Sequence, residues 1–140
     1  MGGGYISCGD FLGEDKSGSA ISGVFEALEP LLSAEASDVM ERLNADVEQR
    51  FDEGEQEFRI PPPLAALLVE PLERYQQELG ARLGHPDPAE APDLDRASGL
   101  DPIDAKWGAG DGWRYYCVHD LLQACQLSRE SGQPVVVSFD

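Results

Sequence analysis

The sequence predicts an α+β domain with three to four helices packed with a small sheet of short strands. Long stretches in which apolar residues recur three and four positions apart indicate amphipathic helices. Short stretches rich in β-branched and aromatic residues near both ends of the chain indicate strands. With 140 residues, the chain fits a single domain, residues 1–140, with one modest core.

The first part of the chain predicts an extended segment followed by a helix. Residues 1–17 are rich in glycine and suit a first strand or an extended arm. From Ile21 to Leu32 the apolar spacing is helical, but Pro30 lies inside this stretch. Because proline lacks the backbone N–H and crowds the preceding turn, the helix should kink or break near Glu29.

A second helix is expected over residues 34–51, where apolar residues recur every four positions among acidic ones. Ser33 and Ser37 are both suitable N-caps, because a serine hydroxyl can accept a hydrogen bond from a free N–H of the first turn. Gly54 is a suitable stop, since glycine readily adopts the left-handed conformation that ends many helices. The stretch therefore predicts an amphipathic helix with a defined start and end.

The third predicted helix has the most regular apolar seam in the chain. After an extended segment, "EQEFRIPPPL", apolar residues recur at steps of four and three from Leu64 to Leu83. Pro71 lies inside this seam, so a kink or a helix-to-helix break is expected there. Such a seam could also pair with another chain, so a structural subunit of a larger complex is one alternative.

Residues 85–106 predict a long acidic, proline-rich loop within the domain. They hold four prolines and six acidic side chains, without apolar periodicity. Connections of more than roughly a dozen residues without secondary structure tend to be functional or disordered. We therefore treat this loop as a candidate binding segment.

The last part of the chain predicts a strand, a helix and a second strand. Bulky residues alternate in "GWRYYC" (112–117) as they do in a strand, and "GAGDG" (108–112) before it fits a hairpin turn. Residues 118–131 have a helical apolar face that ends at Gly132. "PVVVSF" (134–139) then fits a short strand with its proline at the start.

The charge balance disfavours nucleic acid as a direct ligand. The chain has 27 acidic and 10 basic residues, which gives a formal net charge of −17. Binding to a polyanion depends on lysine and arginine side chains that release counterions from its phosphates. A chain this negative should instead attract a basic protein.

The sequence favours a cytoplasmic protein that does not bind a membrane. No apolar run is long enough to cross a bilayer, and the N-terminus lacks the basic and apolar regions of a signal peptide. Cys8, Cys117 and Cys125 are an odd number of cysteines. Without a signal peptide, this number favours reduced thiols.

No other stretch of the sequence looks more like chemistry than "YYCVHD", which puts Cys117, His119 and Asp120 within four positions. On a strand Cys117 and His119 share a face, and on a helix they point about 200° apart, so neither geometry gathers all three side chains. A thiol nucleophile needs an oriented base, and zinc needs about four ligands. We therefore expect no catalytic, cofactor-binding or metal-binding residues. Cys117 and Cys125 are expected in the core, and Asp120 in the first turn of the last helix.

The combination of acidic and aromatic residues around the predicted loop suggests a surface that binds a protein. Aromatic side chains are enriched at interface hot spots, and negative side chains steer a positive partner. Acidic residues can equally form an ordinary solvated face, and tryptophans can belong to the core. The candidate partner-binding residues are Asp87, Asp93, Asp95, Asp101, Asp104, Trp107, Trp113 and Tyr115.

The chain resembles the small acidic immunity proteins that bacteria encode beside polymorphic or type VI secreted toxins. The resemblance rests on its size, its acidity, the α+β pattern and the closing stretch "WRYYCVHDLLQACQLSRESGQPVVVSFD". It implies a non-catalytic inhibitor, or antitoxin, that covers the active site of a cognate toxin. It also implies that the loop 87–104 meets a basic toxin cleft, with Asp93, Asp95, Asp101 and Asp104 mimicking an anionic substrate.

Two other functions remain open at this point. One is a small ligand-binding or enzymatic domain with a pocket near Cys117 and His119. The other is an acidic nucleic-acid mimic that inhibits a DNA-binding protein, which requires carboxylates spaced like phosphates on one face.

Overall fold

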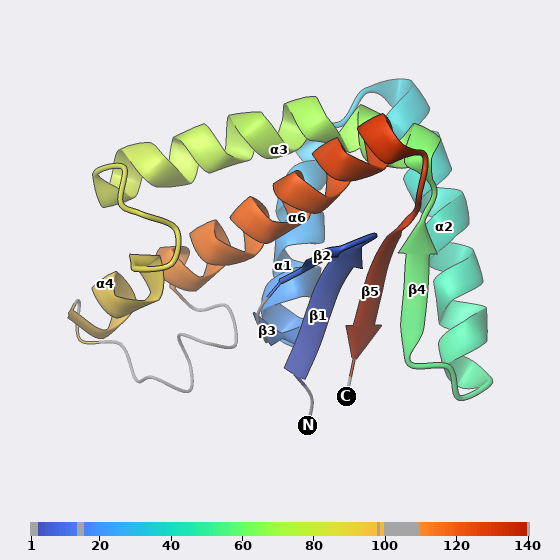
Figure 1. Cartoon of the computed structure of the whole chain (residues 1–140), viewed down its shortest axis with the longest axis horizontal. Helices are drawn as coiled ribbons and strands as arrows, with labels where there is room; N and C mark the ends of the chain where they lie inside the picture. Colours follow the sequence, from blue (N-terminus) through green and yellow to red (C-terminus); the bar gives the residue numbers. More distant parts are fainter. Residues whose placement is uncertain (1–2, 14–15, 98, 100–109, 140) are drawn as a thin grey trace.

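The computed structural model of the chain describes residues 3–13, 16–97, 99 and 110–139. Within these ranges the protein consists of α-helices and one small antiparallel sheet, so the predicted α+β fold class is confirmed. Figure 1 shows long helices α3 and α6 on one side of the sheet and helix α2 beside its β4 edge. No described helix is long and apolar enough to span a bilayer.

The sheet brings the two ends of the chain together. The strand order is β2-β1-β5-β4, with β3 pairing the other end of β1, and every pair is antiparallel. The last strand therefore lies between the first strand and the strand from the middle of the chain (Figure 1). The strands are β1 (Gly3–Cys8), β2 (Phe11–Leu12), β3 (Lys16–Ser17), β4 (Glu57–Ile60) and β5 (Val135–Phe139).

Only one face of the sheet belongs to the core. Ile6 in β1, Ile60 in β4 and Val137 in β5 are buried, and each points toward the helices. Their neighbours in sequence point the opposite way because side chains alternate along a strand. Of these, Val136 is half-buried and Arg59 is exposed. The predicted strands at the N-terminus, before the proline triplet and at the C-terminus are therefore confirmed as parts of a one-sided sheet.

The predicted starts and stops of the early helices are largely confirmed. Before Pro30 the first helix gives way to a 3₁₀ turn, as expected for a residue without a backbone N–H. The Ser33 hydroxyl accepts a hydrogen bond from the Ala36 N–H at 3.2 Å and so caps the second helix. These elements are α1 (Gly18–Leu28), η1 (Glu29–Leu31) and α2 (Ala34–Asp52).

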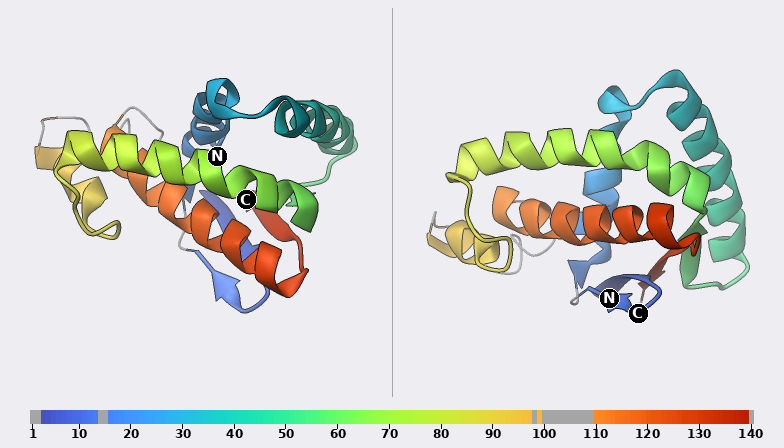
Figure 2. Two further views of the ribbon diagram at one scale, coloured as in Figure 1. Left: turned by 90° about the horizontal axis from the view of Figure 1, so that it is seen from above. Right: turned by 45° about the horizontal axis from the view of Figure 1, so that its top comes forward.

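Helix α3 (Pro62–Leu83) continues through Pro71, so no break into two helices occurs there. A proline inside a helix costs about 3 kcal/mol, and extensive packing must offset it. Pro71 and the adjacent Leu72 are buried, and α3 lies beside α6 along most of its length (Figures 1 and 2). Tertiary packing therefore outweighs the local preference for a break.

Helix α6 (Asp111–Ser131) begins earlier than predicted and includes the whole of "YYCVHD". The expected strand over 112–117 is wrong, and Gly110–Gly112 form the N-cap and first turn of α6 instead of a hairpin turn. Tyr115, Val118 and Leu122 are buried at helical spacing, but the stretch taken for a strand, 112–117, holds only the first of them. The helix ends at Gly132, as predicted, with a left-handed φ of 75°.

Part of the predicted loop is a helix, α4 (Ala91–Ala97), so the expectation of a structureless segment is wrong for these residues. The rest of that segment beyond Gly99 lies outside the described residues. Asp95 in α4 is 4 % exposed. Its carboxylate accepts hydrogen bonds from the N–H groups of Gly112 and Trp113, both at 2.9 Å. Because the N-cap of α6 is a glycine without a side chain, Asp95 supplies the cap from another helix.

Gly112 allows α4 and α6 to approach closely. A Cβ at this position would collide with the backbone of Ala91 in α4. Gly23 in α1 offers a contrast, because a Cβ there would meet no atom within 4 Å. The absent side chain of Gly112 therefore makes room for a neighbouring helix, and that of Gly23 does not.

Replacing Asp95 with alanine should lower the free energy of unfolding by about 1–2 kcal/mol, since two N–H groups of α6 lose their acceptor. Chemical denaturation measures this change. The matched control is Asp93→Ala, which removes an exposed carboxylate from the same helix and should change stability by at most about 0.5 kcal/mol. Equal effects of the two changes would contradict the capping role.

Gly112→Ala should destabilise the protein by about 1–3 kcal/mol although alanine is the better helix former, because the backbone of α4 cannot move away cheaply. Gly23→Ala should instead stabilise it by about 0.5–1 kcal/mol through helix propensity alone. Thermal unfolding of both variants beside the parent protein tests this pair. A stabilised Gly112→Ala variant would refute the close approach of α4 and α6.

Candidate functional site

A groove with a volume of about 530 Å³ lies between α1 and α2, over the side chains of β4 and β5. Phe25 contributes to the α1 wall, and Leu43 and Val47 contribute to the α2 wall. Phe58 and Phe139 line the groove from the sheet. Nine of the fifteen lining residues are apolar, and the lining draws on α1, η1, α2, β4 and β5.

Four phenylalanine rings form a connected cluster at this groove. The ring centroid of Phe58 lies 6.1 Å from Phe25, 6.4 Å from Phe51 and 6.1 Å from Phe139. Phe51 and Phe139 meet edge to face at 5.7 Å. These distances and angles are favourable aromatic geometries, so the rings form one cohesive apolar surface. Antiparallel pairing of β4 with β5 brings Phe58 and Phe139 to the same face.

The apolar stripe of α2 is only partly covered. Of the 19 residues of helix α2, only Ala36 and Met40 are buried. Leu43 and Val47 are half-buried, and Phe51 is 37 % exposed. A surface helix normally buries such a stripe against the core. The C-terminal half of this stripe instead borders the groove, where a partner could cover it.

The rim of the groove is acidic. Glu26 and Glu29 lie on the α1 side, and Glu41 and Glu48 lie on α2, and all four are exposed. Among the described residues that line the groove, none is a lysine or an arginine. The site therefore combines an apolar floor with acidic residues on both walls.

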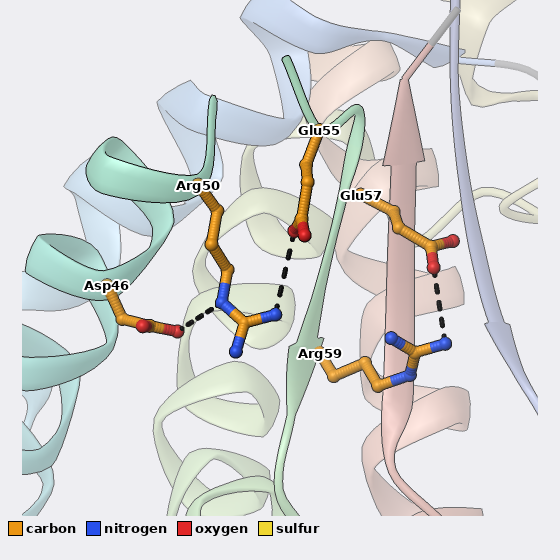
Figure 3. A network of polar contacts seen from close by, with 5 residues as sticks. All are labelled: Asp46, Arg50, Glu55, Glu57 and Arg59. Atoms are coloured by element: carbon orange, nitrogen blue, oxygen red, sulfur yellow. Dashed lines mark ion pairs between the residues drawn. The ribbon is translucent and has the colours of Figure 1, made fainter. Parts of the chain in front are cut away.

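The arginines nearest the phenylalanine cluster pair with carboxylates outside the groove lining (Figure 3). Arg50 contacts Asp46 at 2.9 Å and Glu55 at 3.5 Å. Arg59 contacts Glu57 at 3.2 Å. Both Arg59 and Glu57 point away from the groove, because they alternate with the inward-facing Phe58 along β4. Such exposed pairs add little stability, and none of them includes a glutamate of the groove rim.

The described members of the predicted partner-binding set lie around α4 and the first turns of α6, where the Trp113 N–H donates to Asp95. Asp87 and Asp93 are exposed near α4, whereas Asp95 is buried as the cap of α6. Trp113 is half-buried in the first turn of α6, and its ring lies 6.0 Å from that of Tyr116. Tyr115 is 8 % exposed and belongs to the core. The three remaining candidates, Asp101, Asp104 and Trp107, lie outside the described residues.

The residues of "YYCVHD" do not converge. Cys117 is fully buried, whereas the His119 ring is half-buried, with its Nε2 atom 3.0 Å from the side-chain nitrogen of Gln123. Asp120 lies in the middle of α6, so its predicted position in the first turn is wrong. Within the part of the chain that the structure describes, no group of three His, Cys, Asp or Glu side chains could hold a metal ion.

The groove was not predicted from the sequence, because its phenylalanines were assigned to apolar faces or to strands. A signal was nevertheless present. Phe51 ends the apolar stripe of a helix that is strongly acidic elsewhere, and Phe58 follows after a short turn. The sequence does not reveal that α1 and α2 stand apart and leave the stripe uncovered.

The three cysteines, all within the described residues, form no disulfide and are buried, in line with the expected core positions of Cys117 and Cys125. Burial raises the pKa of the Cys125 thiol to about 12, and the nearby Cys8 thiol adds to this shift. Burial also raises the pKa of Cys8. Both thiols therefore stay protonated at neutral pH, and the thiolate is the form that reacts.

In the folded protein, Cys125 should resist a thiol reagent at pH 8. With a pKa of about 12, roughly one molecule in 10,000 carries the thiolate at that pH. A variant that retains only this cysteine, Cys8→Ala with Cys117→Ala, can be treated with Ellman's reagent. The same variant in guanidinium chloride should react fully and is the control. Fast stoichiometric reaction of the folded variant would contradict the burial of Cys125.

Comparison with known proteins does not place the chain in a family. No protein-family model matches it, and no match was found among curated proteins or solved structures. Inferences about function therefore depend on the groove, its charge and the placement of the predicted residues.

Proposed function

We propose that the chain is a non-catalytic inhibitor that binds a basic protein, and that it acts as an immunity protein by covering the active site of a cognate toxin. The observation that carries this proposal is the apolar groove whose rim holds Glu26, Glu29, Glu41 and Glu48 without a basic residue. The net charge of −17 favours a basic partner for the molecule as a whole.

The acidic rim and the apolar floor of the groove suit different stages of binding. Negative charge on one protein speeds its encounter with a positive partner. Aromatic side chains such as Phe51, which is 37 % exposed, supply affinity once water is excluded. The apolar floor also favours a protein partner over mimicry of nucleic acid, because a mimic needs carboxylates spaced like phosphates and gains nothing from a phenylalanine cluster.

The alternative of an enzyme near Cys117 and His119 receives less support. The two side chains differ in burial, as expected for positions about 200° apart on a helix. The high pKa of Cys125 likewise disfavours a thiolate nucleophile at that position.

Removing the charge of the α2 rim should slow binding of the partner. The tagged protein first captures partners from its native host, and the captured protein is then expressed alone and with the chain. We expect a basic protein that inhibits growth alone and is neutralised by the chain. For the purified pair, Glu41→Gln with Glu48→Gln should slow association about tenfold at low salt and flatten its salt dependence.

The matched control is Glu73→Gln with Glu78→Gln, which removes the same charge from exposed positions on α3, outside the groove. It should change association less than threefold. A third variant, Asp87→Asn with Asp93→Asn, tests the acidic segment near α4. If the captured protein is not toxic, or if its activity persists in the complex, the inhibitor function is wrong. If the third variant alone slows association, binding occurs near α4 rather than at the groove.

A further inference from the structure

The proposed function leaves open what kind of segment the partner presents to the groove. We propose, building on that function, that the groove binds an amphipathic α-helix of the partner. This helix would carry an apolar face toward the phenylalanine cluster and lysine or arginine side chains along both flanks.

The length of the groove matches a helix of about four turns. On α2 the lining runs from Ser37 to Phe51. At 1.5 Å per residue, this stretch extends for roughly 21 Å. Its lining residues recur at helical spacing, so they form the ridge and groove pattern into which a second helix packs.

The floor supplies a place for a large apolar anchor. Phe51 is exposed at the end of the stripe, and Val47 is half-buried one turn before it. An amphipathic helix presents apolar residues at positions i, i+3 or i+4, and i+7. Side chains with that spacing would cover Leu43, Val47 and Phe51 in turn, which completes the burial that α2 lacks in the free protein.

The charges of the two walls determine the flanks of the bound helix. Glu26 and Glu29 belong to one wall, and Glu41 and Glu48 to the other. A helix lying between the walls would therefore meet carboxylates on both sides of its apolar face. Lysine and arginine suit these positions, since their aliphatic stems cover apolar surface while their charged ends reach the rim.

A second copy of this chain is a poor occupant. Each copy carries a net charge of −17, and α2 itself has six acidic and two basic residues. Insertion of the same helix into the groove of another copy would place like charges together in a partly desolvated site. The occupant is therefore a basic helix from a different protein.

Three labelled synthetic peptides of about 16 residues test this inference with the purified protein. The first has a leucine and phenylalanine stripe at helical spacing with lysines on both flanks. The second has the same composition in a scrambled order that removes the stripe. The third keeps the stripe but carries a central proline, which disrupts the helix. Fluorescence anisotropy measures binding, and circular dichroism measures the helix content of the bound peptide.

We expect the first peptide to bind at least tenfold more tightly than the other two and to gain helix on binding. Glu41→Gln with Glu48→Gln should weaken it about tenfold, and Val47→Asp should abolish specific binding. The α3 variant, Glu73→Gln with Glu78→Gln, should change affinity less than threefold. The rim glutamates are exposed, so their variants keep the fold even if Val47→Asp does not.

Equal affinity for the three peptides would overturn the helix inference. General attraction between a cationic peptide and an acidic protein would then be enough to explain the binding. Equal weakening by the groove and α3 variants would overturn the helix inference as well. Failure of the helix inference can be distinguished from failure of the proposed inhibitor function. If a toxin is neutralised but the peptides bind alike, the inhibitor stands and the helix is wrong. If the first peptide binds selectively but no toxin is found, the groove stands and the function is wrong.

Discussion

The insertion of β5 between β1 and β4 is the constraint on which the rest of the structure depends. It joins the two ends of the chain to its middle, and it presents Ile6, Ile60 and Val137 to the helices as one apolar face. The same pairing puts Phe139 beside Phe58. The floor of the groove therefore exists only when the last strand is in place, so the binding surface forms together with the core.

Elements with strong local signals could be predicted from the sequence, whereas elements that depend on distant contacts could not. The end of α1 before Pro30 and the cap at Ser33 follow from the chemistry of single residues. Helix α4 and the start of α6 depend on each other, because Asp95 caps α6 across a gap of 17 residues from Gly112. A short acidic segment with several prolines gives no local sign of that contact, so it resembled a loop.

The candidate site likewise has one feature that the sequence reveals and one that depends on distant contacts. The negative charge was evident from composition, but its location was not. The acidic segment near α4 and the groove beside α2 lie toward opposite ends of the molecule (Figures 1 and 2). A partner of ordinary interface size does not need to reach both. The predicted surface around Asp87 and the observed groove are therefore competing locations for one partner, and the apolar floor favours the groove.

The groove also explains why strong acidity and an exposed apolar surface occur together in one small domain. An uncovered cluster around Phe51 would promote self-association in a neutral protein. On the proposed function, the surrounding glutamates would make two copies repel each other and would attract a partner of opposite charge. In that case the charge would discourage a second copy at the apolar floor and would speed the arrival of a basic partner, so specificity and association rate would arise from the rim and affinity from the phenylalanines.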